Sequence, residues 1–593
     1  MTFQKFSKVL IIGIDGMDPI IVQELFSENK LQNFQRLAEE GSFLKLNTSN
    51  PPNSPVAWTS IATGVNPGKH NIFDFIKRNP DNYMPELSLS KSVGEKYESI
   101  VKAESFWKYT SKAGIPTTII RWPVTFPTEK FNGKMLSGLG VPDIKGFLSG
   151  YSYYAEDVET KRTQNNILKV VRKNDLIETK LFGPKIRTGK NIFDVKEIMQ
   201  IITIDNKTIE LIINNKKHSI KKNQWSNWIK AEFKIGLLKK VSGIFKVYMK
   251  SINPFKMYLT TVQIDPVSPI QPISHPKNYS KELAEDIGYF YTLGIPEETA
   301  GVEDGRISEK AFLEQVAEIE EEKTKMFWKE FENFKKEKQA VYAFVFDSSD
   351  RIQHMFYNKN DNKEIKSYYL KKDDFIGEVL EQSDDKTLLL IVSDHGINSF
   401  KRAVSINTWL VENNFMTLTK ELKEDENESL FKNVDWNRTQ AYAVGFNSIY
   451  INLKNREGNG IVEDKEEIIN EIINKLEKLN DGKKMVVNKV YRKEDIYSGN
   501  YVKDAPDLII GFNKGYRMSW QSSIGGFTKE IITDNKKKWQ GDHLIDPSFV
   551  PGVLFSNIKF KKLFANQPDI TPTILDALKI KIANRLDGKS LFE

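Results

Sequence analysis

Residues 341–354 read Val-Tyr-Ala-Phe-Val-Phe-Asp-Ser-Ser-Asp-Arg-Ile-Gln-His, an apolar run followed directly by acidic and imidazole side chains. An uninterrupted apolar run predicts a β-strand that is buried on both faces, as in a parallel sheet between helices. Asp350 and His354 would then follow the C-terminal end of that strand. Because strand ends are rigid, the stretch predicts an α/β fold with metal ligands along one edge of the sheet.

The same arrangement occurs at two other places in the chain. Residues 388–392 are apolar and are followed by Ser-Asp-His-Gly, which supplies Asp394 and His395. Residues 9–14 form a third such run, which ends in Asp15. Three predicted strand ends therefore supply three acids and two histidines, enough to begin a site for two metal ions.

The predicted fold is α/β, with a central, mostly parallel sheet flanked by helices. Strand-like and helix-like patterns alternate from residue 8 to about 145, and this alternation resumes near residue 341. Between them, residues 198–204 and 208–213 look like strands joined by a turn, which is typical of an antiparallel β-rich insertion. The predicted parts are core residues 1–148, a β-rich insertion at 149–300, core residues 301–415, a smaller α+β segment at 416–515, and core residues 516–593.

Composition limits the classes of protein that fit. The 593 residues are 39% hydrophobic and 28% charged, which suits a globular protein of several domains. The net charge of +7 comes from 86 basic and 79 acidic residues, and the short Lys runs are interspersed with acids. The sequence contains no basic stretch interleaved with aromatic residues, the pattern that would predict nucleic-acid binding. The chain has no cysteine, which excludes thiolate metal sites, disulfides and Cys nucleophiles.

The sequence has no segment that predicts a membrane anchor or a signal peptide. The first residues lead directly into a predicted strand, and no apolar run reaches the length of about 18 residues that a membrane-spanning helix needs. We therefore expect a cytoplasmic location by default. The expected partner is a small molecule. The oligomeric state stays open.

Any metal in this chain must be bound by His, Asp, Glu or hydroxyl groups. Only six histidines occur, and a third one, His543, also follows an aspartate, in the sequence Gly-Asp-His at 541–543. Histidine is the commonest neutral metal ligand, and carboxylates offset the charge of divalent ions. His543 is therefore a further candidate ligand.

Ser54 is the candidate nucleophile. It precedes Pro55 and a helix-like run that Gly64 ends, so helix capping alone would explain a serine here. A helix N-terminus also stabilises negative charge, which favours both an alkoxide and a bound phosphoryl group. Thr48, Thr59 and Ser60 are weaker candidates, because Thr59 and Ser60 fall inside the predicted helix and Thr48 lies well before it.

Taken in order, these motifs resemble the alkaline phosphatase superfamily, most closely its type I phosphodiesterase and nucleotide pyrophosphatase branch and a bacterial group of predicted phosphohydrolases or phosphomutases. The resemblance runs from residue 9 nearly to the end and leaves mainly the β-rich insertion uncovered. The residues that carry it are 13–18, 54–60, 63–70, 350–354, 393–396, 451–458, 505–507, 541–543 and 569–575.

The resemblance implies a two-metal phosphoric ester hydrolase, most closely a phosphodiesterase, that forms a phosphoseryl intermediate on Ser54. One metal would be bound by Asp15, Asp394, His395 and the Ser54 hydroxyl, and the other by Asp350, His354 and His543. Zinc is favoured for nitrogen and oxygen ligands at this count, and manganese or iron would also fit. A phosphomonoesterase or phosphomutase on the same scaffold is the alternative activity, and a catalytically silent binding protein is the alternative from another class.

The sequence departs from the family pattern at three points. The nucleophile is Ser, where the pyrophosphatase branch usually has Thr. An Asn that this branch uses against the phosphoryl oxygen falls at Phe75 in this sequence. The motif around Ser54 also lacks the Arg expected of sulfatases. The residues that could replace the missing Asn are Asn53, Lys69, Asn71 and Arg121.

Overall fold

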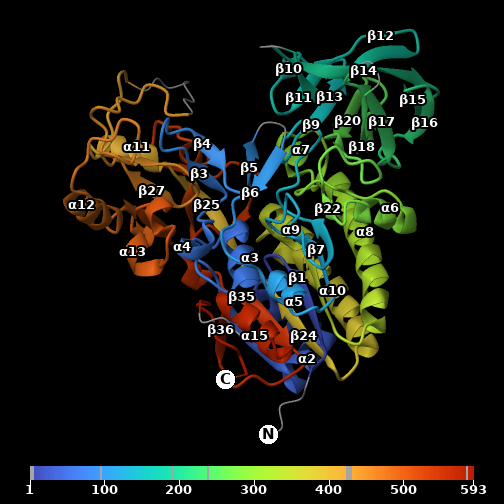
Figure 1. The fold of residues 1–593 in the computed structure, drawn as a ribbon. Helices are drawn as coiled ribbons and strands as arrows, with labels where there is room; N and C mark the ends of the chain where they lie inside the picture. The colour runs from blue at the N-terminus through green and yellow to red at the C-terminus, as the bar shows by residue number, and fades with distance from the viewer. Residues whose placement is uncertain are drawn as a thin grey trace. The chain divides into compact units, whose positions relative to one another are not determined.

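The computed structural model describes residues 6–93, 96–188, 191–236, 239–421, 430–581 and 585–592. These residues form two compact units (Figure 1). The first unit combines Met1–Thr117 with Phe334–Glu593, and the second is Thr118–Asn333. The chain therefore leaves the first unit, builds the second, and returns.

The first unit is built on a mixed sheet with the strand order β23-β1-β24-β35-β2-β36. Strand β1 pairs in parallel with both β23 and β24, and β2 pairs in parallel with β36. Only β35 runs antiparallel to its two neighbours, β24 and β2. The predicted mostly parallel α/β fold is confirmed. The strands are β1 (Lys8–Ile14), β2 (Ser42–Asn47), β23 (Ala340–Phe346), β24 (Thr387–Val392), β35 (Gly552–Ser556) and β36 (Phe564–Asn566).

The central strands are buried along their whole length, as their apolar sequences predict. Every residue of β1, β23 and β24 is buried, so both faces of these strands are covered. Two groups of helices flank the sheet: α15 contacts α3 and α5, and α10 contacts α2 and α9 (Figure 1). These helices are α2 (Gln32–Glu40), α3 (Ser54–Thr63), α5 (Phe106–Lys112), α9 (Ser348–Phe356), α10 (Lys363–Gln382) and α15 (Ile570–Ala577).

A smaller α+β part of the first unit has a core of its own. Its sheet has the strand order β26-β27-β31-β30, and helices α11 and α12 contribute buried apolar residues to the same cluster. A further short sheet has the order β32-β25-β33, with β34 also paired to β25. The elements are α11 (Ile406–Glu412), α12 (Glu466–Leu476), β25 (Asn398–Val404), β26 (Ala441–Ala443), β27 (Ser448–Ile451), β30 (Val487–Arg492), β31 (Leu508–Phe512), β32 (Gly515–Met518), β33 (Ile532–Asp534) and β34 (Gly541–Asp542).

The second unit is rich in β-structure, and the predicted insertion at 149–300 lies inside it. It contains two five-stranded sheets, ordered β10-β11-β9-β20-β19 and β12-β13-β14-β15-β16, and a three-stranded sheet ordered β17-β18-β21. Among the described residues, no helix is both long and apolar enough to cross a membrane. The elements are β9 (Tyr151–Ala155), β10 (Lys161–Arg162), β11 (Asn166–Lys169), β12 (Arg172–Lys173), β13 (Leu176–Thr188), β14 (Asn191–Thr203), β15 (Thr208–Ile213), β16 (Lys216–Lys221), β17 (Ile229–Lys234), β18 (Lys240–Phe245), β19 (Val247–Ser251), β20 (Lys256–Thr260), β21 (Gln263–Ile264), α6 (Tyr279–Ile287), α7 (Thr299–Glu303) and α8 (Glu309–Lys336).

The buried centre of β24 predicts a large effect of truncation. Leu390 has no exposed surface, so Leu390→Ala should lower the free energy of unfolding of the first unit by about 2–5 kcal/mol through lost burial and a cavity. The control is Leu563→Ala. Leu563 is 91% exposed, so this substitution should change the free energy of unfolding by less than about 0.5 kcal/mol. Denaturant titration followed by circular dichroism measures both. Equal effects would contradict the assigned burial of β24.

Candidate metal centre

Three carboxylates from three separate segments meet at the C-terminal edge of the central strands. Asp15 follows β1, and its backbone N–H donates to the carbonyl of Phe346 at the end of β23 (2.9 Å). Asp394 follows β24, and its Oδ1 accepts the backbone N–H of Gly16 (3.1 Å). Asp350 lies in the first turn of α9, directly after β23. All three side chains are almost completely buried, so the fold itself brings these acids together.

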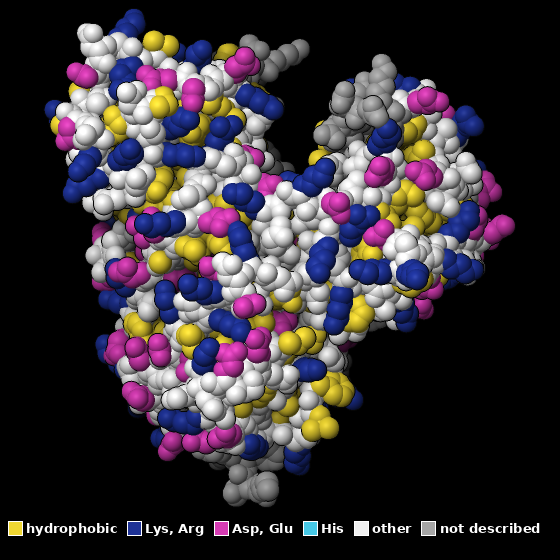
Figure 2. Space-filling model, turned by 180° about the vertical axis from the view of Figure 1, so that it is seen from behind, with side chains coloured by type: hydrophobic (Ala, Val, Ile, Leu, Met, Phe, Trp, Pro, Cys, Tyr) yellow, Lys and Arg dark blue, Asp and Glu magenta, His cyan; other side chains and the backbone are white. Residues whose placement is uncertain are grey.

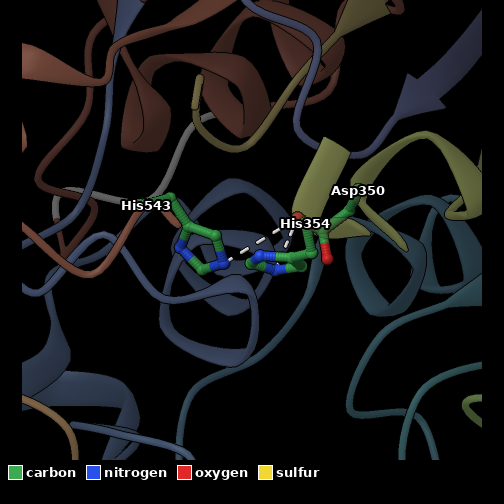
Figure 3. A group of neighbouring side chains, drawn as sticks. All are labelled: Asp350, His354 and His543. Carbon is green, nitrogen blue, oxygen red and sulfur yellow. Dashed lines mark ion pairs between the residues drawn. The ribbon is translucent and has the colours of Figure 1, made fainter. Parts of the chain in front are cut away.

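Asp350 and His354 are on a helix, which the sequence did not indicate. We expected both to follow a strand directly, but α9 begins at Ser348 and places them one turn apart. Their side chains therefore leave α9 on the same side, since residues four apart share a helix face. The 3.2 Å approach of His354 Nε2 to Asp350 Oδ1 follows from this spacing (Figure 3).

Burying these acids without a cation is electrostatically unfavourable. Burial, together with the neighbouring Asp394 and Asp350, raises the pKa of Asp15 well above its usual value. Burial also raises the pKa of Asp394 to about 7. For Asp350 burial acts in the same direction, but His354 and Arg351 outweigh it and hold its pKa well below the usual range. The site therefore favours positive charge.

The three histidines near these acids all have the same tautomer. Each Nδ1 lies against a backbone carbonyl: His354 against Gly541 (2.7 Å), His395 against Gly396 (3.0 Å) and His543 against Pro52 (2.6 Å). Because a carbonyl can only accept, each Nδ1 carries the proton, and Nε2 of the neutral ring keeps a free lone pair.

Burial also keeps two of these rings neutral. It lowers the pKa of His543 to about 4 and that of His395 well below its usual value. Metal-binding histidines commonly show this state, a neutral ring whose second nitrogen donates to a carbonyl.

The free Nε2 atoms point toward the buried carboxylates. His395 Nε2 lies 3.1 Å from Asp394 Oδ2 and 3.7 Å from Asp15 Oδ1. His543 Nε2 lies 3.8 Å from Asp350 Oδ1. A nitrogen lone pair facing an anionic oxygen is repulsive unless a cation lies between them. Asp15 Oδ1 and Asp394 Oδ2 accept no hydrogen bond from any residue that the structure describes, so these residues fit a divalent cation.

Two overlapping groups of ligand atoms meet the distance requirement for a metal ion. One is Asp350, His354 and His543 (Figure 3), and the other is Asp15, Asp350 and His395. In each group the ligand atoms lie within 4.8 Å of one another. Asp350 belongs to both groups. Asp394 joins the second group through its 3.1 Å approach to His395. The structure thus brings all the predicted metal-binding side chains together.

Ser54 lies beside this centre. Its Oγ is 3.0 Å from His395 Nε2, and the residue is 6% exposed. We expected Ser54 to be the N-cap, but the extended residue Asn53 takes that position and Ser54 is the first residue of α3. Ser60, a weaker candidate, donates to Val56 inside the helix, and Thr59 donates to Pro55.

The four candidate phosphate-binding residues differ in their surroundings. Asn53 is buried next to Ser54, and its Nδ2 donates to Asp74 Oδ1 (3.2 Å). Lys69 forms an ion pair with Asp587. The Asn71 amide is 3.4 Å from the carbonyl of Ile100. Arg121 belongs to the second unit, where its Nη1 donates to the carbonyl of Leu293 (3.1 Å).

Several supporting residues could not be identified from the sequence. Trp58 Nε1 donates to Asp15 Oδ2 (3.0 Å), although its position inside an apolar helix gave no such signal. Asp542 accepts from Trp539 Nε1 (2.9 Å) and pairs with Arg517 Nε (3.0 Å). Trp539 in turn stacks on the ring of His354, with ring centroids 3.8 Å apart. The position of Asp542 directly before His543 was the only available hint of this support.

His70, which ends one of the family motifs, is not among these ligand groups. It is completely buried, its Nε2 lies 3.0 Å from Ser60 Oγ, and its Nδ1 accepts the backbone N–H of Ile72. Because Ser60 Oγ already donates to Val56, His70 Nε2 must carry the proton here. His70 is thus a neutral structural histidine, with a pKa that burial lowers to about 3.

A comparison with protein families identifies the relationship. The sequence profile of the type I phosphodiesterase / nucleotide pyrophosphatase family matches residues 9–186 and 216–543. The chain belongs to this family. The resemblance to the phosphodiesterase and nucleotide pyrophosphatase branch is confirmed, and the chain is a hydrolase that acts on phosphoric ester bonds. A search of curated proteins finds no match.

Solved structures of low sequence identity resemble the chain as well. Human ectonucleotide pyrophosphatase/phosphodiesterase 5 shares 11% identity, with 98% of this chain and 97% of that chain covered and a TM-score of 0.42. Phosphonoacetate hydrolase from Sinorhizobium meliloti 1021, in complex with phosphonoacetate, shares 10% identity, with 97% and 96% covered and a TM-score of 0.47. Similarity at this level carries no information about the substrate of this family member.

The buried state of His70 predicts a pH dependence of stability. Its pKa is about 3 in the folded chain against 6.5 for the free side chain, so the unfolded chain binds the proton more readily. The stability that neutral His70 contributes is complete above pH 6.5 and is lost as the pH falls toward 3. Over this window His70 should lower the free energy of unfolding by about 1.4 kcal/mol for each unit by which the pH falls.

Denaturant titration of His70→Gln at pH 6 and pH 5 tests this pH dependence. The variant should lose less stability on acidification than the unmodified chain does. An identical loss in both would contradict a neutral buried His70.

Proposed function

We propose that this chain is a metal-dependent phosphodiesterase that hydrolyses small-molecule phosphate diesters through a phosphoseryl intermediate at a two-metal site. The observation that carries the proposal is the convergence of unprotonated histidine Nε2 atoms and buried carboxylates beside the Ser54 hydroxyl. Asp15, Asp394, His395 and the Ser54 hydroxyl would hold one ion. Asp350, His354 and His543 would hold the other.

Zinc suits this donor set best. The donors are imidazole nitrogens and carboxylate oxygens without a thiolate, a combination that zinc takes readily and that manganese or iron also accept. When bound, such ions supply Lewis-acid polarisation of phosphoryl oxygens. The chain contributes the fixed direction of each ligand, because backbone carbonyls orient the three imidazoles.

Ser54 acts as the nucleophile. The bond from Ser54 Oγ to phosphorus forms while the bond from phosphorus to one ester oxygen breaks, and the serine proton finally resides on the departing alcohol. Water then attacks the phosphoseryl group, which releases a phosphate monoester and restores the Ser54 hydroxyl. The N-terminal end of α3 favours the negative charge that develops on Oγ and on the phosphoryl oxygens.

Asn53 is the best supported of the candidates that could bind a phosphoryl oxygen. It is adjacent to Ser54, it is buried, and Asp74 fixes its side-chain amide. Lys69 is engaged with Asp587, and Asn71 contacts the carbonyl of Ile100. A phosphomonoester carries a second negative charge and would require further cations, so the engagement of Lys69 favours a diester.

Removal of the Ser54 hydroxyl tests the nucleophile. Ser54→Ala should reduce turnover of an aryl phosphate diester by at least about 10³-fold, because no covalent intermediate can form. Ser54→Thr should keep measurable turnover, since it retains a hydroxyl. Ser60→Ala, in the same helix, is the matched control and should retain turnover. Undiminished turnover by folded Ser54→Ala would exclude Ser54.

Metal content tests the ligand assignment. The purified chain should hold two divalent ions, and Asp350→Asn should lose metal most severely, because Asp350 belongs to both ligand groups. Asp374 is exposed on α10, and Asp374→Asn should leave the content unchanged. Elemental analysis after gel filtration gives the number of metal ions per chain. Fewer than one ion in the unmodified chain would favour a catalytically silent protein.

A further inference from the structure

The β-rich part of the second unit has a net positive charge larger than that of the whole chain. Residues 161–256 contain 22 Lys and Arg but only 7 Asp and Glu, a net charge of +15. The whole chain has a net charge of +7, so all other residues together carry −8. Such asymmetry indicates that this segment meets a negatively charged partner.

The same segment exposes large apolar side chains. Of its residues, Ile198 is 59% exposed, Ile192 is 58% exposed and Phe193 is 52% exposed. Exposed apolar groups are common singly, but a concentration of them marks a surface that contacts an apolar environment. The exposed set is Val171, Leu176, Ile192, Phe193, Ile198 and Ile204.

Strand register places several of these groups on one side of the sheet β12-β13-β14-β15-β16. Leu176 lies opposite Ile202, and Lys180 lies opposite Ile198. On the next pair of strands, Ile212 of β15 lies opposite Lys217 of the edge strand β16. Because side chains alternate along a strand, these residues share one surface, which we call the outer face. Its members are Leu176, Glu178, Lys180, Ile198, Gln200, Ile202, Thr208, Glu210, Ile212, Lys217, Ser219 and Lys221. Glu210 forms an ion pair with Lys217 (2.9 Å), so Lys180 and Lys221 are the lysines of this face with which an anionic partner would pair first.

The opposite side of this sheet is an ordinary core. Ile177, Met199, Ile201 and Leu211 are at most 1% exposed. The sheet therefore already buries one apolar surface, and the apolar residues of the outer face are not needed for that core. Figure 2 shows the second unit at upper left, with Lys and Arg side chains spread over it and hydrophobic atoms between them.

We propose that the outer face docks onto an anionic lipid surface. Lysine ammonium groups would contact acidic headgroups while the exposed Ile and Leu side chains enter the acyl boundary, the combination used by peripheral membrane-binding surfaces. Nucleic acid would satisfy the charge, but it would favour aromatic side chains for base stacking, and only Phe193 in the exposed set is aromatic. The proposal is independent of the catalytic activity.

Vesicle sedimentation with the full chain tests the proposal. Vesicles with about one-third phosphatidylserine should bind at least tenfold more tightly than pure phosphatidylcholine vesicles, and added salt should weaken the binding. The pair Lys180→Glu with Lys221→Glu, and the pair Leu176→Ser with Ile198→Ser, should each weaken binding at least tenfold. All four residues point outward, so thermal unfolding by circular dichroism should be unchanged.

Matched controls come from exposed residues elsewhere. Leu563 is 91% exposed and the Lys310 side chain is 85% exposed, so Leu563→Ser and Lys310→Glu should leave vesicle binding intact. Binding that does not distinguish the two vesicles, or that survives both double substitutions, would overturn the proposal. So would binding of an oligonucleotide without vesicle binding, or a dimer that the same substitutions dissociate while lipid is never bound.

Discussion

The central constraint on this structure is the burial of three carboxylates around the free Nε2 atoms of neutral histidines. Asp15, Asp350 and Asp394 would repel one another in a medium of low dielectric, and the lone pairs of His395 and His543 add to that repulsion. A folded chain tolerates such a group only when positive charge balances it. Arg351 supplies one such charge at Asp350 Oδ2 (2.7 Å), and divalent ions would supply the rest.

The rest of the first unit holds these groups in place. Parallel pairing of β1 with β23 and β24 brings three chain segments to one edge of the sheet. Helix α9, which follows β23, carries the two ligands Asp350 and His354. Backbone carbonyls from distant segments, Pro52 and Gly541 among them, fix the imidazoles. Each ligand direction therefore depends on tertiary contacts between segments far apart in the sequence, which explains why the site requires the whole unit.

Much of the site could be predicted because its chemistry is local in the sequence. The apolar runs before Asp15 and Asp394 predict buried strands, which places these acids at strand ends. Histidines are scarce in this chain, so the ones that lie next to acids are easily recognised as candidate ligands. What could not be predicted depends on contacts across long separations. Examples are the antiparallel β35 within the sheet, the Trp58 bond to Asp15, and the ion pair that engages Lys69 with Asp587. Local signals also misplaced the start of α3 by one residue, since both Asn53 and Ser54 are good capping residues.

Anomalous X-ray diffraction from crystals of the metal-loaded chain, recorded on both sides of the metal absorption edge, tests the central claim most directly. The account predicts two anomalous peaks, one enclosed by Asp350, His354 and His543 on their Nε2 sides and one beside Asp15, Asp394 and His395. The absence of anomalous peaks at this centre, or peaks that lie beside the Nδ1 atoms of the histidines, would contradict the account.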